Sequence, residues 1–143
     1  MITRRETLFA AFALVCQQAA AQDPKRPSQK SHSSASGLVF EHDLPNITME
    51  DWQVTVSEVD FPPGRKGRVH HHAGFVLAFV LEGAILNNVS GQAERVYHKG
   101  EMFYEPPGST HLVSDNASTT EPARLLAMIF AKKGATLTMP GPA

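Results

Sequence analysis

The sequence predicts an all-β protein, built as an antiparallel sandwich or barrel. Short apolar runs of strand length recur at close spacing, and turn residues such as Gly, Pro and Asn separate them. No segment combines a convincing N-cap with two turns of helical periodicity, although the composition of residues 124–131 would also suit a helix. The length of 143 residues fits one domain, and a hydrophobic content of 42% is enough for a core.

The first strand is expected at Trp52, Val54 and Val56, which alternate with polar residues and should share one buried face. Residues 75–81 are continuously apolar, and their Val and Phe content and the flanking glycines favour a strand over a buried helix. Further short strands are predicted at residues 84–89, 93–97, 102–104, 110–114 and 125–131.

Residues 1–21 have the order of parts found in a secretory signal peptide. Arg4 and Arg5 precede a short apolar run, and three alanines at 19–21 form a small-residue cleavage site. The run is shorter than the ~20 residues that cross a bilayer, so no membrane span is predicted. The general secretory and twin-arginine routes both stay open. Residues 22–37 are predicted to be a flexible linker and 38–143 the β-barrel domain of an exported protein, periplasmic or secreted.

Charge and cysteine content exclude several classes of function. The formal net charge is −1 and there is no long basic block, so nucleic acid is not the expected partner. Cys16 is the one cysteine and lies in the predicted signal peptide, which excludes a disulfide framework and a cysteine-rich zinc module. A phosphate-binding loop, a Ser-His-Asp order and a helical metalloprotease motif are all missing from the sequence.

Seven histidines in so short a chain are the unusual feature, and three of them are consecutive. On a strand, His70 and His72 would lie on the same face while His71 faces away. Two neutral imidazoles on one strand are half of a site for a divalent transition metal. His111 follows the turn at 106–110 and is the expected third ligand from a neighbouring strand. The spacing alone leaves ordinary surface or core histidines as an equal alternative.

Two motifs around these histidines resemble those of the cupin family. Residues 64–83 read G-x5-H-x-H-x3-V-x6-G, and residues 100–115 read G-x5-P-x-G-x2-H-x3-D. The resemblance extends over roughly residues 38–131. It implies a single jelly-roll β-barrel, or double-stranded β-helix, with a divalent metal inside the barrel on His70, His72 and His111. It also implies a homodimer, because cupin barrels commonly pair through edge strands.

The first motif departs from the family pattern at Val76, where a glutamate ligand follows the two histidines in many cupins. Val76 shares the strand parity of His70 and His72, so it should point into the same cavity without being able to bind an ion. A three-histidine site is one interpretation, as in the cupins that include β-diketone-cleaving, cysteine, gentisate and salicylate dioxygenases. A weakened or missing metal site is the other interpretation, and the survival of all three histidines favours the first. The second motif has Asp115 where asparagine is usual.

Three further residues are candidates for the surroundings of the metal. Glu105 could accept a hydrogen bond from a ligand imidazole, and Tyr104 could orient a substrate oxygen. Phe79 is a candidate for the cavity wall, where apolar side chains would suit a flat, carbon-rich ligand. For each of them the alternative is ordinary packing or, for Glu105, a solvated side chain.

These features predict an exported, metal-dependent oxygenase that acts on a small enol, phenol or diketone-like substrate. Fe(II) is the favoured ion, and Mn, Ni, Cu, Zn and Co remain alternatives because all accept imidazole ligands. Arg65, Lys66 and Arg68 stand just before the histidine strand, where they could attract an anionic substrate or belong to a solvated loop. The alternatives in function are a cupin that binds a small molecule without turnover and a cupin isomerase or cyclase.

Overall fold

The computed structural model describes residues 37–143, which form antiparallel strands and no helix. The all-β prediction is confirmed, including a strand where the composition of 124–131 had left a helix open. The predicted signal peptide and, except for Gly37, the predicted linker lie outside the described residues. The strands are β1 (Trp52–Phe61), β2 (His70–His72), β3 (Phe75–Glu82), β4 (Ala84–Val89), β5 (Arg95–His98), β6 (Met102–Glu105), β7 (Thr110–Asn116), β8 (Ala123–Lys132) and β9 (Thr138–Pro140).

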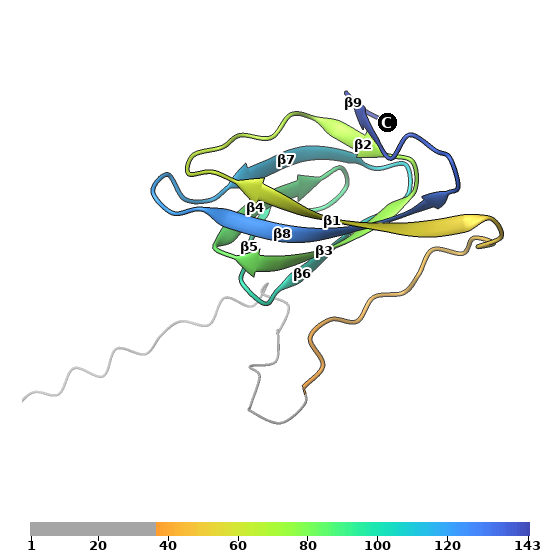
Figure 1. Ribbon diagram of the computed structural model, residues 1–143, viewed down its shortest axis with the longest axis horizontal. Helices are drawn as coiled ribbons and strands as arrows, with labels where there is room; N and C mark the ends of the chain where they lie inside the picture. Colours follow the sequence, from red (N-terminus) through yellow and green to blue (C-terminus); the bar gives the residue numbers. More distant parts are fainter. Residues whose placement is uncertain (1–36) are drawn as a thin grey trace, which may run out of the picture. The chain divides into compact units, whose positions relative to one another are not determined.

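The strands form two sheets of four and five strands, with the orders β1-β8-β3-β6 and β5-β4-β7-β2-β9. Consecutive strands repeatedly change sheet, and Figure 1 shows β8 lying between β1 and β3 while β7 runs beside β2 in the other layer. This is the jelly-roll arrangement of a double-stranded β-helix, as predicted. Within residues 37–143 no helical segment has the length and apolar character needed to cross a bilayer.

The core lies between the two sheets and is built from side chains that alternate inward along each strand. Its fully buried members come from both sheets, with Val80 and Ile85 completely shielded from solvent. The remaining members of this cluster are Phe61, Ala78, Phe103, Ala123 and Leu125. One end of the space between the sheets is therefore filled, and the histidines lie toward the other end.

The buried face predicted for the first strand is wrong. β1 pairs with β8 from Trp52 to Phe61 without a register shift, so its side chains alternate along the whole strand. Val54 and Val56 are 50% and 52% exposed, whereas Val59 and Phe61 face the interior. The outer face of this sheet is itself apolar, and for this reason the period-2 pattern of β1 did not reveal which face meets the second sheet.

The loop from β1 to β2 is held against β7 by the side chains of Asp115 and Asn116, the last two residues of β7. Lys66 Nζ and the Gly67 amide donate to the two oxygens of Asp115, at 2.9 and 2.8 Å. A Cβ at position 67 would overlap the Ser114 carbonyl, so only glycine allows this close approach. Asn116 Nδ2 donates to the carbonyls of Phe61, Pro62 and Glu121 at 2.8–3.1 Å. These contacts fix the position at which the histidine strand begins.

Candidate metal centre

The three histidines singled out in the sequence converge in the structure. β2 and β7 are neighbours in the five-stranded sheet, and His70 and His111 are partners in their register. One ring nitrogen from each of His70, His72 and His111 lies within 4.8 Å of the other two. His71 points elsewhere, with Nδ1 3.1 Å from the Gly141 carbonyl oxygen. The prediction that His70 and His72 share a face and that His111 joins them from another strand agrees with this geometry.

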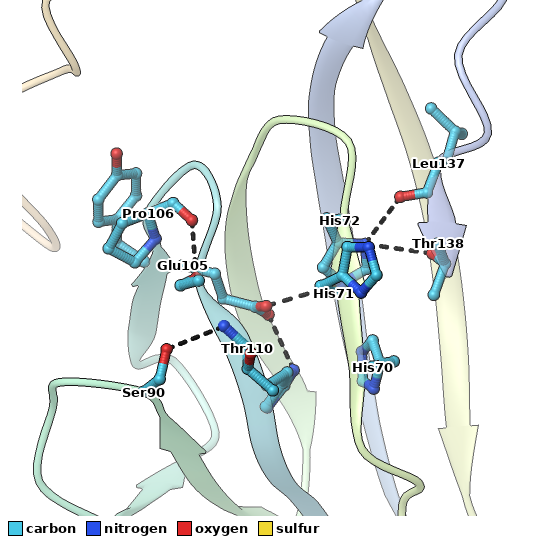
Figure 2. A network of polar contacts seen from close by, with 12 residues as sticks. His70, His71, His72, Ser90, Glu105, Pro106, Thr110, Leu137 and Thr138 are labelled. Carbon is cyan, nitrogen blue, oxygen red and sulfur yellow. Dashed lines mark hydrogen bonds and ion pairs between the residues drawn. The ribbon is translucent and has the colours of Figure 1, made fainter. Parts of the chain in front are cut away.

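Backbone carbonyls orient the two histidines of β2. His70 Nδ1 lies 2.7 Å from the Arg68 carbonyl oxygen, and His72 Nδ1 lies 3.1 Å from that of Leu137. A carbonyl only accepts hydrogen bonds, so each Nδ1 carries the proton and each Nε2 keeps a free lone pair. Thr138 Oγ1 is also 3.1 Å from His72 Nδ1. Figure 2 marks this contact and the one to Leu137 with dashed lines. Both rings are thus fixed in the tautomer that a metal ion requires.

His111 is the most buried of the three, at 3% exposure, and neither of its ring nitrogens has a hydrogen-bond partner. Burying a polar atom without a partner costs roughly 1–3 kcal/mol, so such atoms in a native structure need a reason. A metal ion bound at one of these nitrogens would supply that reason. The three imidazoles therefore fit a divalent transition metal in both chemistry and geometry.

The surroundings favour a neutral imidazole at His70. Burial is the main cause and lowers the pKa of His70 below its usual value of 6.5. The neighbouring rings of His111 and His72 lower the pKa further, while the Arg68 carbonyl and Glu105 raise it. The net effect keeps the lone pair of this ring available near neutral pH.

Glu105 lies at the end of β6 with its carboxylate directed into the group of histidines (Figure 2). Its Oε1 is 3.2 Å from His111 Nδ1, and its Oε2 is 3.6 Å from His72 Nε2. The residue is only 5% exposed. Of the two alternatives left open for Glu105, a partner of a ligand imidazole or a solvated side chain, this position favours the first.

The other predicted surroundings divide between the two faces of the four-stranded sheet. Val76 lines the cavity, as its parity predicts. Phe79 and Tyr104 do not line it, and their predicted roles at the site are wrong. Each follows or precedes an inward-facing neighbour on its strand, so each points to the outer face. Tyr104 packs there against His42, with the two rings tilted by 36° and their centroids 4.1 Å apart.

The histidines open onto a cavity of about 730 Å³ between the sheets. Much of its wall is apolar and comes from β1, β3 and β8 of the four-stranded sheet. Three cations of the β1–β2 loop, Arg65, Lys66 and Arg68, also line it, and Glu105 is the one acidic residue among the described lining residues. The cavity therefore combines a metal-binding wall, an apolar wall and a cationic wall.

β9 was not predicted from the sequence, although this short strand supports the site. β9 pairs with β2 along the whole strand, that is, at His70, His71 and His72. Thr138 in β9 and Leu137 just before it provide the oxygens that hold His72 Nδ1. Three residues are too few for a periodic pattern to indicate a strand. Every residue has a backbone carbonyl, so the sequence does not show which carbonyl will accept a hydrogen bond from His72.

Comparison with known families now identifies the class. Residues 57–129, slightly more than half of the chain, match the cupin domain family. The chain belongs to this family, which confirms the resemblance of its two histidine motifs. A comparison with curated proteins found no match.

Solved structures support the same fold. The DMSP lyase DddQ from Ruegeria pomeroyi aligns with a TM-score of 0.53 and 20% identity, over 61% of this chain and 42% of that one. A cupin-like protein from Thermotoga maritima aligns with a TM-score of 0.52 and 21% identity, over 63% of this chain and 65% of that one. The oxalate decarboxylase of Bacillus subtilis, which has Mn(II) centres, aligns with a TM-score of 0.50 and 21% identity, over 61% of this chain and 23% of that one. The chain thus spans less than half of the lyase, and at these identities the likeness concerns the fold.

Proposed function

We propose that this cupin is an exported, metal-dependent oxygenase acting on a small enol, phenol or diketone-like compound. The observation that carries the proposal is the group of three imidazoles, two of them fixed by backbone carbonyls, at the wall of a cavity of about 730 Å³. A bound divalent ion, with Fe(II) favoured, would supply Lewis-acid chemistry that lowers the pKa of an enol or phenol and open positions for O₂. The described residues would position the substrate.

The cationic wall supports a substrate that binds as an anion. Lys66 is neutralised by Asp115 at 2.9 Å, and the Arg65 guanidinium donates to the Asp60 carbonyl and lies over the Phe61 ring. Arg68 lines the cavity without an ion pair to any described residue. Its charge is therefore available to an enolate, phenolate or carboxylate oxygen.

The test combines metal content with oxygen consumption. The protein is purified with Fe(II), its metal is measured by elemental analysis, and O₂ uptake is followed with a panel of 1,3-diketones, flavonols and catechols. We expect about one ion per chain and uptake with at least one compound class. His72→Ala and His111→Ala should lose the metal and the uptake, whereas His98→Ala, an exposed histidine on β5, should keep both.

Two outcomes would replace this function by another. A metal-loaded protein that binds members of the panel but consumes no oxygen would be a binding cupin. Turnover that persists under strict anaerobiosis would indicate an isomerase or cyclase. Purified wild-type protein that takes up no metal would contradict the metal site itself.

We also propose that the protein is exported and forms a homodimer. Export is supported by the signal-like order of residues 1–21, and a mass consistent with cleavage after Ala21 would verify it. The dimer is supported by the apolar outer face of the four-stranded sheet, with Val54 and Val56 half exposed on its edge strand β1. An exposed apolar face beside an open strand edge is stabilised when a second copy covers it.

A further inference from the structure

Glu105 lies beside Val76, the position at which the first motif lacks its glutamate. Glu105 and Val76 are register partners on β6 and β3, so their side chains stand next to each other on the inner face. Both line the cavity. A carboxylate at position 105 therefore enters the group of histidines from the strand beside the one that carries Val76.

The distances from this carboxylate suit a shared ion. Oε2 lies 3.6 Å from His72 Nε2, the nitrogen that the Leu137 carbonyl leaves free for ligation. Ligand atoms bonded to one transition-metal ion at about 2.1 Å lie about 3–3.5 Å from one another. Oε1 lies 3.2 Å from a ring nitrogen of His111, which has no hydrogen-bond partner. One carboxylate thus contacts two of the three imidazoles from inside the cavity.

The electrostatic environment of Glu105 gives an independent reason. The carboxylate is buried, and its ion-pair partners among the described residues are the two imidazoles alone, with no lysine or arginine. An imidazole carries positive charge only when it is protonated, and a protonated ring cannot bind a metal. A buried carboxylate without a lasting positive partner is expensive, and a divalent cation at the histidines would supply that partner.

We propose that Glu105 is the fourth protein ligand of the metal and replaces the glutamate that position 76 lacks. This inference rests on the proposed metal site. With Glu105 bound, the centre has three imidazoles and one carboxylate, and its net charge falls from +2 to +1. The ligand set keeps its composition, while the carboxylate comes from β6 instead of β3.

The test measures the affinity for Co(II) alone, by competition with a chelator, together with the visible spectrum of the Co(II) protein. Glu105→Gln should weaken binding about 100-fold or more, since the loss of outer hydrogen-bond partners already costs 10–100-fold. Its spectrum should shift, because an oxygen ligand is lost. The double variant Val76→Glu/Glu105→Gln should recover most of the affinity, because it returns a carboxylate to the adjacent strand. Glu101→Gln, an acidic residue bound to Arg95, is the matched control and should bind as the wild type does.

A different result identifies a different role for Glu105. If the carboxylate only accepts a hydrogen bond from His111 Nδ1, the glutamine oxygen can accept it as well, and affinity and spectrum should barely change. That outcome, with His72→Ala still unable to bind Co(II), would overturn the fourth ligand and leave the proposed function standing. Wild-type protein that binds no Co(II) would remove the metal site and the inference together.

Discussion

Two neighbouring rows of side chains cross the four-stranded sheet one residue apart, and they face opposite sides. The inner row consists of Thr55, Ile129, Val76 and Glu105, of which the last three line the cavity. The outer row consists of Val56, Met128, Leu77 and Tyr104. Both rows contain aliphatic side chains, yet only the inner one faces a second sheet. Val76 is 1% exposed and Val56 is 52% exposed, so the same residue type has opposite environments.

The difference shows that in this fold the packing of the two sheets, and not the strand itself, decides which face is the interior. A one-residue step along β6 leads from Glu105 among the histidines to Tyr104 against His42. The carboxylate of Glu105 lies on the inner face, between the two sheets, where the residue is only 5% exposed. The outer face carries exposed apolar side chains, which a second copy of the chain would cover in the proposed homodimer.

The largest effect is expected on the free energy of unfolding, when one phenylalanine from each face is replaced by alanine. Phe103→Ala removes a side chain that is 2% exposed in the core, and we expect the free energy of unfolding to fall by about 3–5 kcal/mol. Phe79→Ala removes a half-buried ring from the outer face and should cost about 1 kcal/mol in the monomer. Urea denaturation of both metal-free variants measures the difference. Equal losses in dilute monomeric protein would contradict the separation into an interior and an outer face.

The next effect concerns assembly. Val56→Asp places a charge on the outer face at the edge strand β1, and we expect the dissociation constant of the proposed dimer to rise about 10–100-fold, as burial of one valine is worth about 1.5–3 kcal/mol. Sedimentation velocity at several concentrations measures it. Gln53→Asp adds the same charge on the opposite side of β1 and serves as the control. A wild-type chain that stays monomeric at high concentration would show that another contact, or none, covers this face.

Most of the fold could be predicted from the sequence because most strands follow a local pattern of apolar and turn residues. The apolar run of residues 75–81, bounded by glycines, became β3, and the turn at 106–110 led into β7, as predicted. The buried face of β1 could not be predicted from the valines, since both faces of the sheet are apolar and burial there depends on contacts between distant strands. β9 was not predicted because its three residues are too few to show a periodic pattern.

The sequence predicted those parts of the site in which residue spacing along one strand determines where the side chains point. It did not predict those that depend on how two strands pair. His70 and His72 share a face because they are two residues apart on a strand, and Val76 follows the same parity. That Glu105 stands beside Val76 depends on how β6 aligns with β3, which no local pattern records. Phe79 shows the converse error, because an aromatic residue near a motif suggested a cavity wall while its parity assigned it to the outer face.

The smallest expected effect is a pH dependence that belongs to the inner face. Burial lowers the pKa of His70 below 6.5 in the folded, metal-free protein, so the unfolded chain binds more protons below that pH. The free energy of unfolding should therefore be fully retained above pH 6.5 and fall as the pH decreases below it. One group contributes at most about 1.4 kcal/mol per pH unit. Urea denaturation at several pH values from about 7.5 down to about 5.5 measures this slope. His70→Gln should flatten the slope, whereas substitution of the exposed His98 should leave it unchanged, and an unaltered slope in His70→Gln would assign the pH dependence to other groups.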